Sequence, residues 1–269
     1  MLTAPKSITI IDQIGNTIIM PAPAQRIVCL VPSLTETLCE MGLQNMVVGV
    51  TKFCIYPKNI NKKVTQIGGT KNINVDKIKA LKPHIIIASK EENIKEQIEA
   101  LQPYAQVYVT DIKTIDDTVS ALNDIAVITD TNLVNFAWYK KLLAYNNMPL
   151  EVPKFNVIYL IWRRPYMGVG GNTFIHFMLE KAGYINCLKY TNRYPIITKL
   201  FLLSTPIDFI FLSSEPFPFT QKHINELQIL LPYTKIILVD GEIFSWYGHR
   251  TTKALTYFAN LQKIIASYD

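Results

Sequence analysis

The sequence predicts an α/β protein made of two similar lobes that are joined by a long helix. Three observations carry this prediction. Apolar strands alternate with helical stretches, the order of elements in the first half recurs in the second, and a long segment between the halves contains no helix breaker. Strands that alternate with helices form parallel sheets covered by helices on both faces. We therefore expect an N-terminal lobe over residues 1–113, a linking helix over 114–148, and a C-terminal lobe with a terminal helix over 149–269.

The first lobe is predicted to open with a β-hairpin that turns at Gly15 and Asn16. Four apolar runs and three amphipathic segments follow it. The predicted strands are residues 26–31, 47–50, 84–89 and 105–109, and the predicted helices are 34–41, 76–81 and 91–101. Ser33 stands before the first of these helices and Glu36 lies three residues further on, which is the spacing of a capping box.

The second half repeats this order of elements. Strands are predicted at residues 155–161, 207–214 and 235–239, and helices at 173–181 and 226–231. The Leu-x-Pro-Tyr segments around Pro103 and Pro232 precede strands that end at Asp111 and Asp240, and both pairs are 129 residues apart (232 − 103 and 240 − 111). Several such pairs in the same order indicate a duplicated α/β lobe.

The segment between the two copies is predicted to be helical. No glycine or proline occurs between Pro103 and Pro149, and apolar residues recur at steps of three, four or seven. A single helix over residues 116–146 would span roughly 45 Å at about 1.5 Å per residue. The β-branched residues within 127–131 lower helix propensity, so a bend or break is expected there if anywhere.

The amino-acid composition limits the classes of protein to which this chain can belong. Hydrophobic residues make up 49% of the 269 residues and charged residues 18%, which provides a sizeable core. The net charge of +6 comes from lysines that are spread along the chain, without the basic and aromatic clustering of nucleic-acid-binding proteins. No secretory signal or membrane-spanning run is evident. The four cysteines form no CxxC pair, and we expect buried free thiols.

Two facing α/β lobes leave a cleft lined by the loops at the carboxyl ends of their strands. In this chain those loops carry aromatic and cationic side chains. The predicted ligand-binding residues are Ser33, Phe53, Tyr56, Trp162, Arg163, Arg164, Tyr166, Phe217, Trp246, Tyr247, His249 and Arg250. One of Arg163 and Arg164 is expected to make a structural ion pair, and Trp138 is expected to pack.

Several segments, taken together and in order, resemble one known family. They are RIVCLVPSLTETLCEMGLQNMVVGVT, VDKIKALKPHIIIAS, WRRPYMGVGGNTFIHFMLEKAGYIN, SSEPFPF and GEIFSWYGHR. The set resembles the cobalamin and iron-siderophore branch of ABC-transporter substrate-binding proteins, and is most similar to its periplasmic cobalamin-binding members. The resemblance implies two Rossmann-like lobes joined by one helix, and a non-enzymatic protein that captures a corrinoid in the cleft and delivers it to a permease. A bound corrinoid would be the ligand, with no intrinsic cofactor.

Some positions depart from the family's pattern. Where cobalamin-binding relatives place tryptophans in the first lobe, this chain has Thr70 and Ser89, so haem or a ferric siderophore is an alternative ligand. Asp76 matches a carboxylate that docks on a permease, but Lys199 stands in the equivalent region of the second lobe. The resemblance implies a monomeric, extracytoplasmic protein, while the absence of a visible signal keeps a cytoplasmic location open.

Other classes of function were weighed on the same residues. Gly168, Gly170 and Gly171 precede a helix but lack the spacing of a nucleotide-binding loop, and they would instead allow close approach of a ligand to the backbone. An α/β enzyme using the same cleft is a second alternative, with Ser33 as nucleophile, although no nucleophile-elbow motif surrounds that residue. The histidines are too scattered for a bare metal site, although His249 could ligate a metal that is held in a macrocycle.

Overall fold

The computed structural model describes residues 6–267, which divide into two compact units. The first unit comprises the chain up to Asn146 together with Tyr247–Arg250, and the second comprises Asn147–Trp246 and the chain from Thr251 onward. The chain therefore passes between the units at three points, because a short piece of its C-terminal third belongs to the first unit.

The first unit is built on a parallel sheet in the order β5-β4-β3-β6-β7. Its strands are β3 (Ile27–Cys29), β4 (Val47–Val50), β5 (Thr65–Gln66), β6 (Ile85–Ser89) and β7 (Gln106–Thr110). Its helices include α1 (Pro32–Glu40), α2 (Ile60–Lys63), α3 (Val75–Ala80) and α4 (Lys95–Glu99). The predicted hairpin is confirmed as β1 (Lys6–Ile11) and β2 (Thr17–Ala22).

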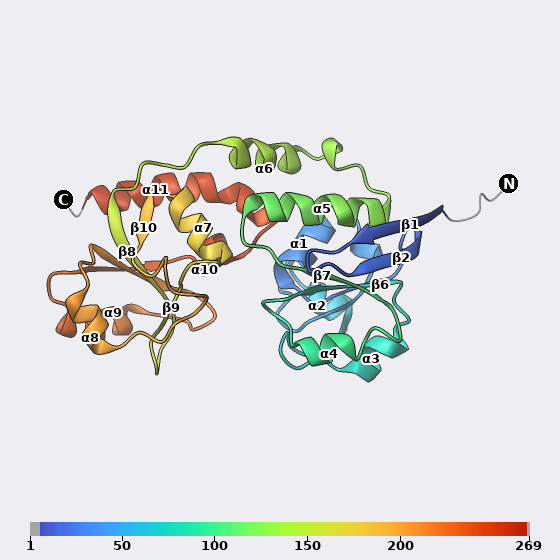
Figure 1. Cartoon of the computed structure of the whole chain (residues 1–269), viewed down its shortest axis with the longest axis horizontal. Helices are drawn as coiled ribbons and strands as arrows, with labels where there is room; N and C mark the ends of the chain where they lie inside the picture. The colour runs from blue at the N-terminus through green and yellow to red at the C-terminus, as the bar shows by residue number, and fades with distance from the viewer. Residues whose placement is uncertain (1–5, 268–269) are drawn as a thin grey trace. The chain divides into compact units, whose positions relative to one another are not determined.

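Alternate strand residues of this sheet are buried on opposite faces. Val28, Ile86 and Val107 pack in one apolar cluster with residues of α3 and α4. On the other face Tyr108 donates a 2.6 Å hydrogen bond to Asp124 of α5 (Ile115–Thr129). Helices therefore cover both faces of the sheet, with α3 and α4 on one side and α1 and α5 on the other (Figure 1).

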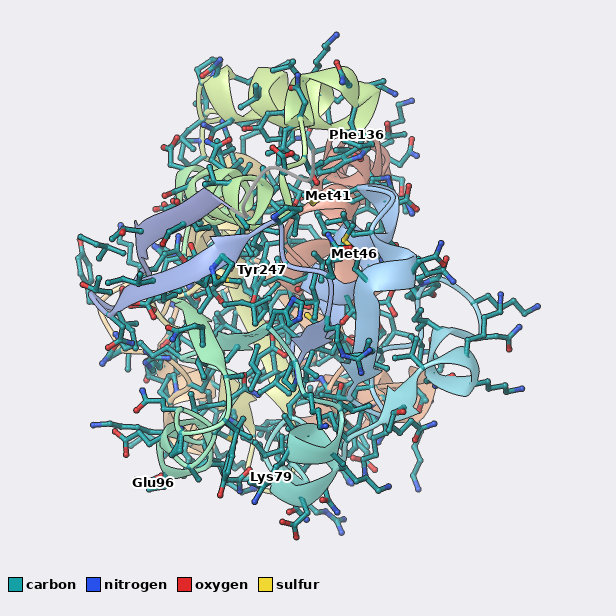
Figure 2. The ribbon with its side chains drawn as sticks, turned by 90° about the vertical axis from the view of Figure 1, so that its right-hand side faces the viewer. Met41, Met46, Lys79, Glu96, Phe136 and Tyr247 are labelled. Carbon is teal, nitrogen blue, oxygen red and sulfur yellow. The ribbon has the colours of Figure 1, made fainter. Side chains whose placement is uncertain are left out.

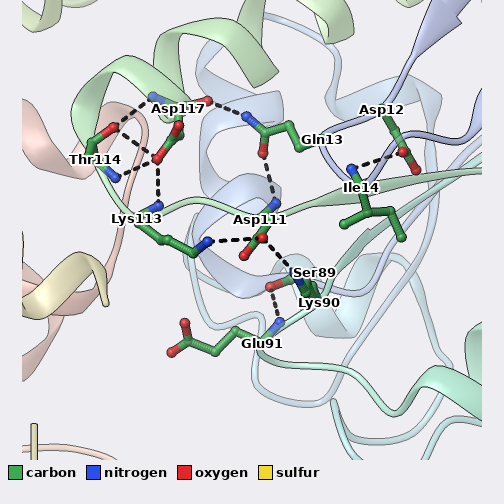
Figure 3. Close-up of polar contacts among 10 residues, drawn as sticks. All are labelled: Asp12, Gln13, Ile14, Ser89, Lys90, Glu91, Asp111, Lys113, Thr114 and Asp117. Atoms are coloured by element: carbon green, nitrogen blue, oxygen red, sulfur yellow. Dashed lines mark hydrogen bonds and ion pairs between the residues drawn. The ribbon is translucent and has the colours of Figure 1, made fainter. Parts of the chain in front are cut away.

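A polar network fixes the start of α5 to the rest of the unit (Figure 3). Thr114 and Asp117 form a capping box at its first turn. Gln13, in the hairpin turn, donates to the Asp117 carbonyl and accepts from the Asp111 amide. Asp111 also pairs with Lys90 at 2.8 Å and with Lys113 at 3.1 Å. The hairpin turn and the carboxyl end of β7 thereby meet at the beginning of α5.

The connecting segment is helical, as expected, but it contains two α-helices rather than one. Asp130 ends α5 in the left-handed conformation, with φ of 53°. A short 3-10 turn, Leu133–Asn135, follows before α6 (Ala137–Asn147) begins. The break falls within residues 127–131, where propensity was weakest, and the local side chains favour it because Asn132 accepts a hydrogen bond from the Val134 amide.

Helix α6 turns back along α5. The Tyr139 hydroxyl donates to Asn123 at 2.8 Å, and the Asn146 amide donates to Asp116 at 2.6 Å. Later residues of α6 therefore meet earlier residues of α5, which defines an antiparallel helical hairpin. This hairpin, up to Asn146, belongs to the first unit.

The second unit has a sheet in the order β10-β8-β11-β12, with β9 pairing antiparallel to β8. The strands are β8 (Phe155–Trp162), β9 (Met167–Gly168), β10 (Tyr184–Asn186), β11 (Phe209–Ser213) and β12 (Lys235–Val239). The helices are α7 (Phe174–Lys181), α8 (Lys199–Ser204), α9 (Gln221–Leu230), α10 (Gly241–Ser245) and α11 (Ala254–Ala266). The expectation of a mixed α/β protein with two parallel sheets is confirmed.

The two faces of this second sheet have different cores. One face is aliphatic, where Ile158, Ile210 and Ile236 pack with residues of α8 and α9. The other is aromatic: Phe211 lies 5.0 Å from Tyr184 and 6.3 Å from Phe244 between ring centroids. Among residues 6–267, no helix has both the length and the apolar character required to cross a bilayer.

Candidate functional site

Two loops at the carboxyl ends of the first unit's strands are joined by the side chain of Asn93. Its carbonyl oxygen accepts from the Ser89 amide at 2.8 Å, and its nitrogen donates to the Thr70 carbonyl at 3.0 Å. Lys71 adds a 2.7 Å bond to the Glu91 carbonyl. The loops after β5 and β6 are consequently held together, with Thr70 in one and Ser89 at the start of the other.

Phe53 lies exposed on this surface. The Lys52 amide donates to the Gly68 carbonyl at 2.8 Å, which holds the loop after β4 against the loop after β5. A Cβ atom on Gly69 would come within 3.3 Å of the Phe53 ring. With 49% of its surface exposed, Phe53 presents an aromatic group of the kind that binds planar ligands.

The segment Tyr247–Arg250 packs into the first unit through closely fitted contacts. Gly248 has φ of +88°, and a Cβ there would lie 2.2 Å from the Thr37 hydroxyl, so only glycine fits. Arg250 donates two 2.8 Å hydrogen bonds to Glu36, one to each carboxylate oxygen. Both side chains are buried, and a charge buried in this way requires a paired partner.

Tyr56 and Tyr247 are engaged with this same region. The Arg250 guanidinium lies 4.1 Å from the centroid of the Tyr56 ring, a cation–π contact. The Tyr247 hydroxyl donates to Glu92 at 3.3 Å. Burial raises the pKa of Tyr247 well above its ordinary value, so the phenol stays protonated. Tyr247, which is labelled in Figure 2, is 6% exposed and belongs to the first unit rather than to the second.

His249 is also part of this packed segment. Its ring meets Trp138 of α6 edge-on, with centroids 5.6 Å apart. Its Nε2 lies 3.9 Å from Glu40, and its backbone amide donates to Thr37. The expectation that Trp138 packs is confirmed, and Trp138 connects α6 with the Tyr247–Arg250 segment.

The predicted capping box at Ser33 is wrong. Helix α1 begins at Pro32, Val31 is its N-cap residue, and Ser33 lies inside the first turn. Proline at the first helical position is favourable because its missing N–H would have no helical partner. Glu36 binds Arg250 instead of the helix start. The Ser33 hydroxyl is buried without a hydrogen-bond partner among the described residues.

In the second unit an aromatic pair, the exposed Trp162 and the half-buried Phe217, marks the end of β8. Trp162 is 41% exposed, and its ring meets Phe217 edge-on at 5.8 Å. Phe217 in turn contacts Phe219 at 4.8 Å. Trp246 (8% exposed) is buried and Trp138 is half-buried, so Trp162 is the most exposed of the three tryptophans.

The two neighbouring arginines differ in their environments. Arg163 makes the expected structural ion pair, with Glu226 at 2.6 Å. Arg164 is exposed beside Trp162 and adopts φ of 67°. Tyr166 packs against the aliphatic core instead of projecting from the loop. Of this group, Trp162 and Arg164 are therefore the side chains most available to a ligand.

Trp246 supports the loop that carries Phe217. Its indole Nε1 donates to a carboxylate oxygen of Glu215 at 2.9 Å, and Ser245 donates to the same oxygen at 2.7 Å. Because Trp246 is only 8% exposed, it acts here through Glu215 rather than as an open aromatic face.

Glycines at positions 168, 170 and 171 are required by packing within the chain and not by a ligand. A Cβ on Gly170 would lie 2.1 Å from the Thr191 carbonyl, and one on Gly171 would lie 2.2 Å from the Lys189 carbonyl. The amides of Gly170 and Gly171 donate to backbone carbonyls of the same crossing segment. The idea that these glycines admit a ligand is therefore wrong.

Several residues with a role in these surfaces were not predicted. Asn93, Glu92 and Glu215 hold loops in place, and each follows a strand end by a few residues, which was the available signal. Glu36 had been assigned to a helix cap. Asp76 is exposed as the second residue of α3. Within residues 6–267, no three or more His, Cys, Asp or Glu side chains are grouped to hold a metal ion.

Comparison with known proteins places this fold among periplasmic binding proteins. The model of the family described as "Periplasmic binding protein" matches residues 27–135. A vitamin B12-binding protein of Pectobacterium carotovorum is 32% identical over 103 residues, or 38% of this chain and 37% of that protein. An uncharacterized ABC transporter substrate-binding lipoprotein of Bacillus subtilis is 34% identical over 113 residues, or 42% of this chain and 35% of that protein.

Solved structures share the fold over nearly the whole chain. The periplasmic vitamin B12-binding protein BtuF of Vibrio cholerae has a TM-score of 0.71 at 19% identity, covering 91% of this chain and 98% of that one. The haem-binding protein BhuT, in complex with two hemes, has a TM-score of 0.75 at 16% identity, covering 90% and 98%. At these identities the likeness concerns the fold.

The sequence match over residues 27–135 and the fold are both of the periplasmic-binding-protein type. By the match over residues 27–135 and by its fold, the chain is similar to class III substrate-binding proteins. The matched segments span 37% and 35% of the two curated relatives, so the relatives' own ligands and partners are not transferred directly.

Proposed function

We propose that this protein binds a corrinoid of the cobalamin type and presents it to an ABC-type importer. The observation that carries the proposal is the exposed Trp162 ring, which is held edge-on by the half-buried Phe217 at the end of β8. An exposed indole face can stack on a ligand, and corrinoids offer a broad, partly apolar macrocycle as its partner. Relatives named as vitamin B12-binding proteins support this choice of ligand.

Polar groups near the aromatic pair fit the substituents of such a ligand. Arg164 is exposed two residues after Trp162, and a guanidinium binds phosphate and amide oxygens well. In the first unit, Phe53 over Gly69 forms a second exposed aromatic surface beside the backbone of the loop after β5. We propose that each of these two surfaces contributes ligand contacts, and each is tested by itself.

Haem is the alternative ligand, because this chain shares its fold with the haem-binding protein BhuT. Haem iron in proteins is held by an axial side chain such as His or Tyr. Here His249 packs on Trp138 and faces Glu40, while Tyr56 carries the Arg250 guanidinium. Because these candidate axial ligands are engaged in structural contacts, a corrinoid, whose cobalt needs no axial ligand from the protein, is the better fit.

A catalytic role for the chain is not supported by its residues. Ser33, considered as a nucleophile, lies buried inside the first turn of α1. The Arg250–Glu36 pair and Tyr247 serve packing in the same unit. We propose stoichiometric binding without turnover, in an extracytoplasmic compartment and as a monomer, with Asp76 of α3 as one point of contact with a permease.

Equilibrium dialysis of the purified chain against cobalamin, cobinamide, haem and a ferric siderophore tests the ligand. We expect saturable binding of one corrinoid per chain and weaker binding of the others. Trp162→Ala should weaken corrinoid binding by at least about tenfold, as loss of a buried aromatic contact does. Tyr233→Ala removes another exposed aromatic of the second unit and should bind like the parent.

A second pair of variants examines the first unit. Phe53→Ala should weaken corrinoid binding, whereas Tyr104→Ala, which removes an exposed ring that stacks with Lys79, should not. Preferential binding of haem would show that the site binds the alternative ligand. Absence of binding to all four compounds would refute the proposed ligand class.

A further inference from the structure

Helix α8 of the second unit carries exposed leucines that do not pack in the core of that unit. Leu202 is 2% exposed and belongs to the aliphatic core, but Leu200 is 75% and Leu203 is 55% exposed. Residues three apart on a helix share a face, so the two leucines form one apolar surface. Ile196, just before the helix, is 63% exposed. We call Ile196, Lys199, Leu200 and Leu203 the α8 patch.

The helix is anchored without the patch. Thr198 caps it by accepting a hydrogen bond from the Phe201 amide at 3.1 Å. Ile197 before the cap and Leu202 at the fourth helical position are both buried, which is the arrangement of a hydrophobic staple. The exposed residues can therefore be changed with little effect on the core, and their apolar character needs another explanation.

The equivalent helix of the first unit presents a different surface. Helix α3 also has a polar N-cap, Asn74, and buries Ile78. Three of its exposed residues, Asp76, Lys77 and Lys79, are charged, and Asp76 has the position that Leu200 occupies in α8. Lys79 of α3 points outward at the end of that unit (Figure 2). The duplicated helices therefore differ in surface chemistry while they share a local fold.

Charge around the patch has one sign along the chain. No aspartate or glutamate occurs between Glu180 and Asp208, whereas Lys189, Arg193 and Lys199 fall in this stretch. Within the same stretch, Tyr190 is 93% exposed, with the Lys189 ammonium 5.1 Å from its ring centroid. Lysines beside exposed aliphatic and tyrosine side chains are the composition of segments that lie at the surface of anionic bilayers.

From this apolar face and its cationic setting, we propose that the α8 patch binds the surface of an anionic lipid bilayer. The leucines and Ile196 enter the boundary of headgroups and acyl chains, while Lys199 stays with the phosphates. A protein partner would need carboxylates of its own, or a closed apolar interface, to match this face. An anionic bilayer, with its phosphates and acyl chains, meets both requirements at once, and we therefore favour the lipid surface. This inference goes beyond the proposed ligand binding and does not depend on it.

Co-sedimentation of the ligand-free full chain with vesicles is the direct test. Vesicles of phosphatidylcholine alone are compared with vesicles that also contain phosphatidylglycerol, at low and high salt. We expect binding to the anionic vesicles that weakens with salt, since screening reduces the attraction of lysines to anionic lipid. Leu200→Glu combined with Leu203→Glu should lower the partition coefficient by at least about tenfold.

Matched controls separate the patch from general charge. Ile229→Glu on α9 changes an isoleucine that is 87% exposed in the same unit and should bind like the parent. Lys199→Glu should weaken binding more than Lys222→Glu, which alters an exposed lysine of α9. Circular dichroism of each variant verifies that the fold is retained.

Three outcomes would overturn the proposal. The first is failure of the parent chain to sediment with anionic vesicles. The second is equal loss of binding in the Ile229→Glu control. The third is a self-association that Leu200→Glu abolishes, seen by analytical ultracentrifugation in a chain that does not bind vesicles, because the patch would then serve a second copy of the chain. None of these results bears on corrinoid binding, which is measured separately.

Discussion

Arg250 and Glu36 are separated by most of the chain, yet they form a two-pronged ion pair with both hydrogen bonds 2.8 Å long. The pair is buried and places a residue of the C-terminal third in the first unit. Tyr56 covers the guanidinium from one face. The pair therefore holds a returning segment of chain against α1.

Breaking this pair should destabilise the first unit. Glu36→Gln leaves a buried guanidinium without its countercharge, which costs about 3–5 kcal/mol in comparable sites. Urea denaturation measures the loss. Lys95→Ala breaks an exposed pair with Glu99 and should change stability little. A Glu36→Gln variant as stable as the parent would show that the pair contributes nothing to folding.

Substitutions at Asp130 test the break between α5 and α6. A broken helix and a continuous helix predict stability changes of opposite sign for alanine at this position. Asp130 has φ of 53°, a conformation that disfavours a Cβ-bearing residue without a local polar group. Asp130→Ala should therefore lower stability by about 1 kcal/mol, and Asp130→Gly should not. In a continuous helix alanine would stabilise instead. Thermal unfolding of the two variants distinguishes these cases.

Asp111 should contribute to the loss of folding stability at acid pH. Its partial burial acts to raise the pKa, but hydrogen bonds from Lys90 and Lys113 outweigh burial and hold the pKa below its ordinary 3.8 (Figure 3). A depressed carboxyl pKa gives stability that is present above 3.8 and is lost as pH falls through the lower, folded-state value.

This prediction can be checked by a carboxyl titration followed by NMR. Replacing Lys90 and Lys113 with methionine should raise the Asp111 pKa relative to the parent, because both donors are lost. Asp111→Asn should also make stability fall less steeply at acid pH. An unchanged Asp111 pKa in the double variant would contradict the assigned cause.

The four free cysteines should be poorly reactive in the folded protein. Burial raises the pKa of Cys39 and of Cys187 from 9.0 to about 11, and raises the pKa of Cys29 and Cys54 as well. Since the thiolate is the reactive form, Cys39 and Cys187 should react with Ellman's reagent at about a hundredth of the rate of a free thiol.

Denaturant provides the control for this measurement. All four thiols should react rapidly in urea, because unfolding removes the burial that raises their pKa values. A native chain that titrates even one thiol at the rate of free cysteine would contradict the burial described for these residues.

Much of the first unit's fold could be anticipated from residue patterns. The apolar runs before Ser89 and Thr110 are buried strands, since such runs have few alternatives in an α/β chain. The last strand was expected at residues 235–239, as found in β12. The helix predicted over 91–101 is only α4 (Lys95–Glu99), because Ser89 and Asn93 take the preceding residues into a bonded loop.

Side-chain roles were harder to anticipate than elements. Trp162 was expected to be available to a ligand and is exposed, whereas Trp246, in an equally aromatic loop, is buried against Glu215. Sequence shows that an aromatic residue follows a strand, but its exposure depends on partners that are distant in the chain. The ligand-binding roles of Trp162 and Phe53 remain predictions for the binding experiments above.

The sequence by itself determined the α/β class, the duplicated order of elements and the likeness to periplasmic binding proteins over residues 27–135. Strand and helix patterns are local, so they can be recognised without knowledge of distant contacts. The sequence also determined the helical character of the segment between the lobes. Tertiary structure alone decided that this segment breaks at Asp130 and folds back as a hairpin. It also decided that Arg250 pairs with Glu36, since a buried charge is placed by whichever distant partner can neutralise it.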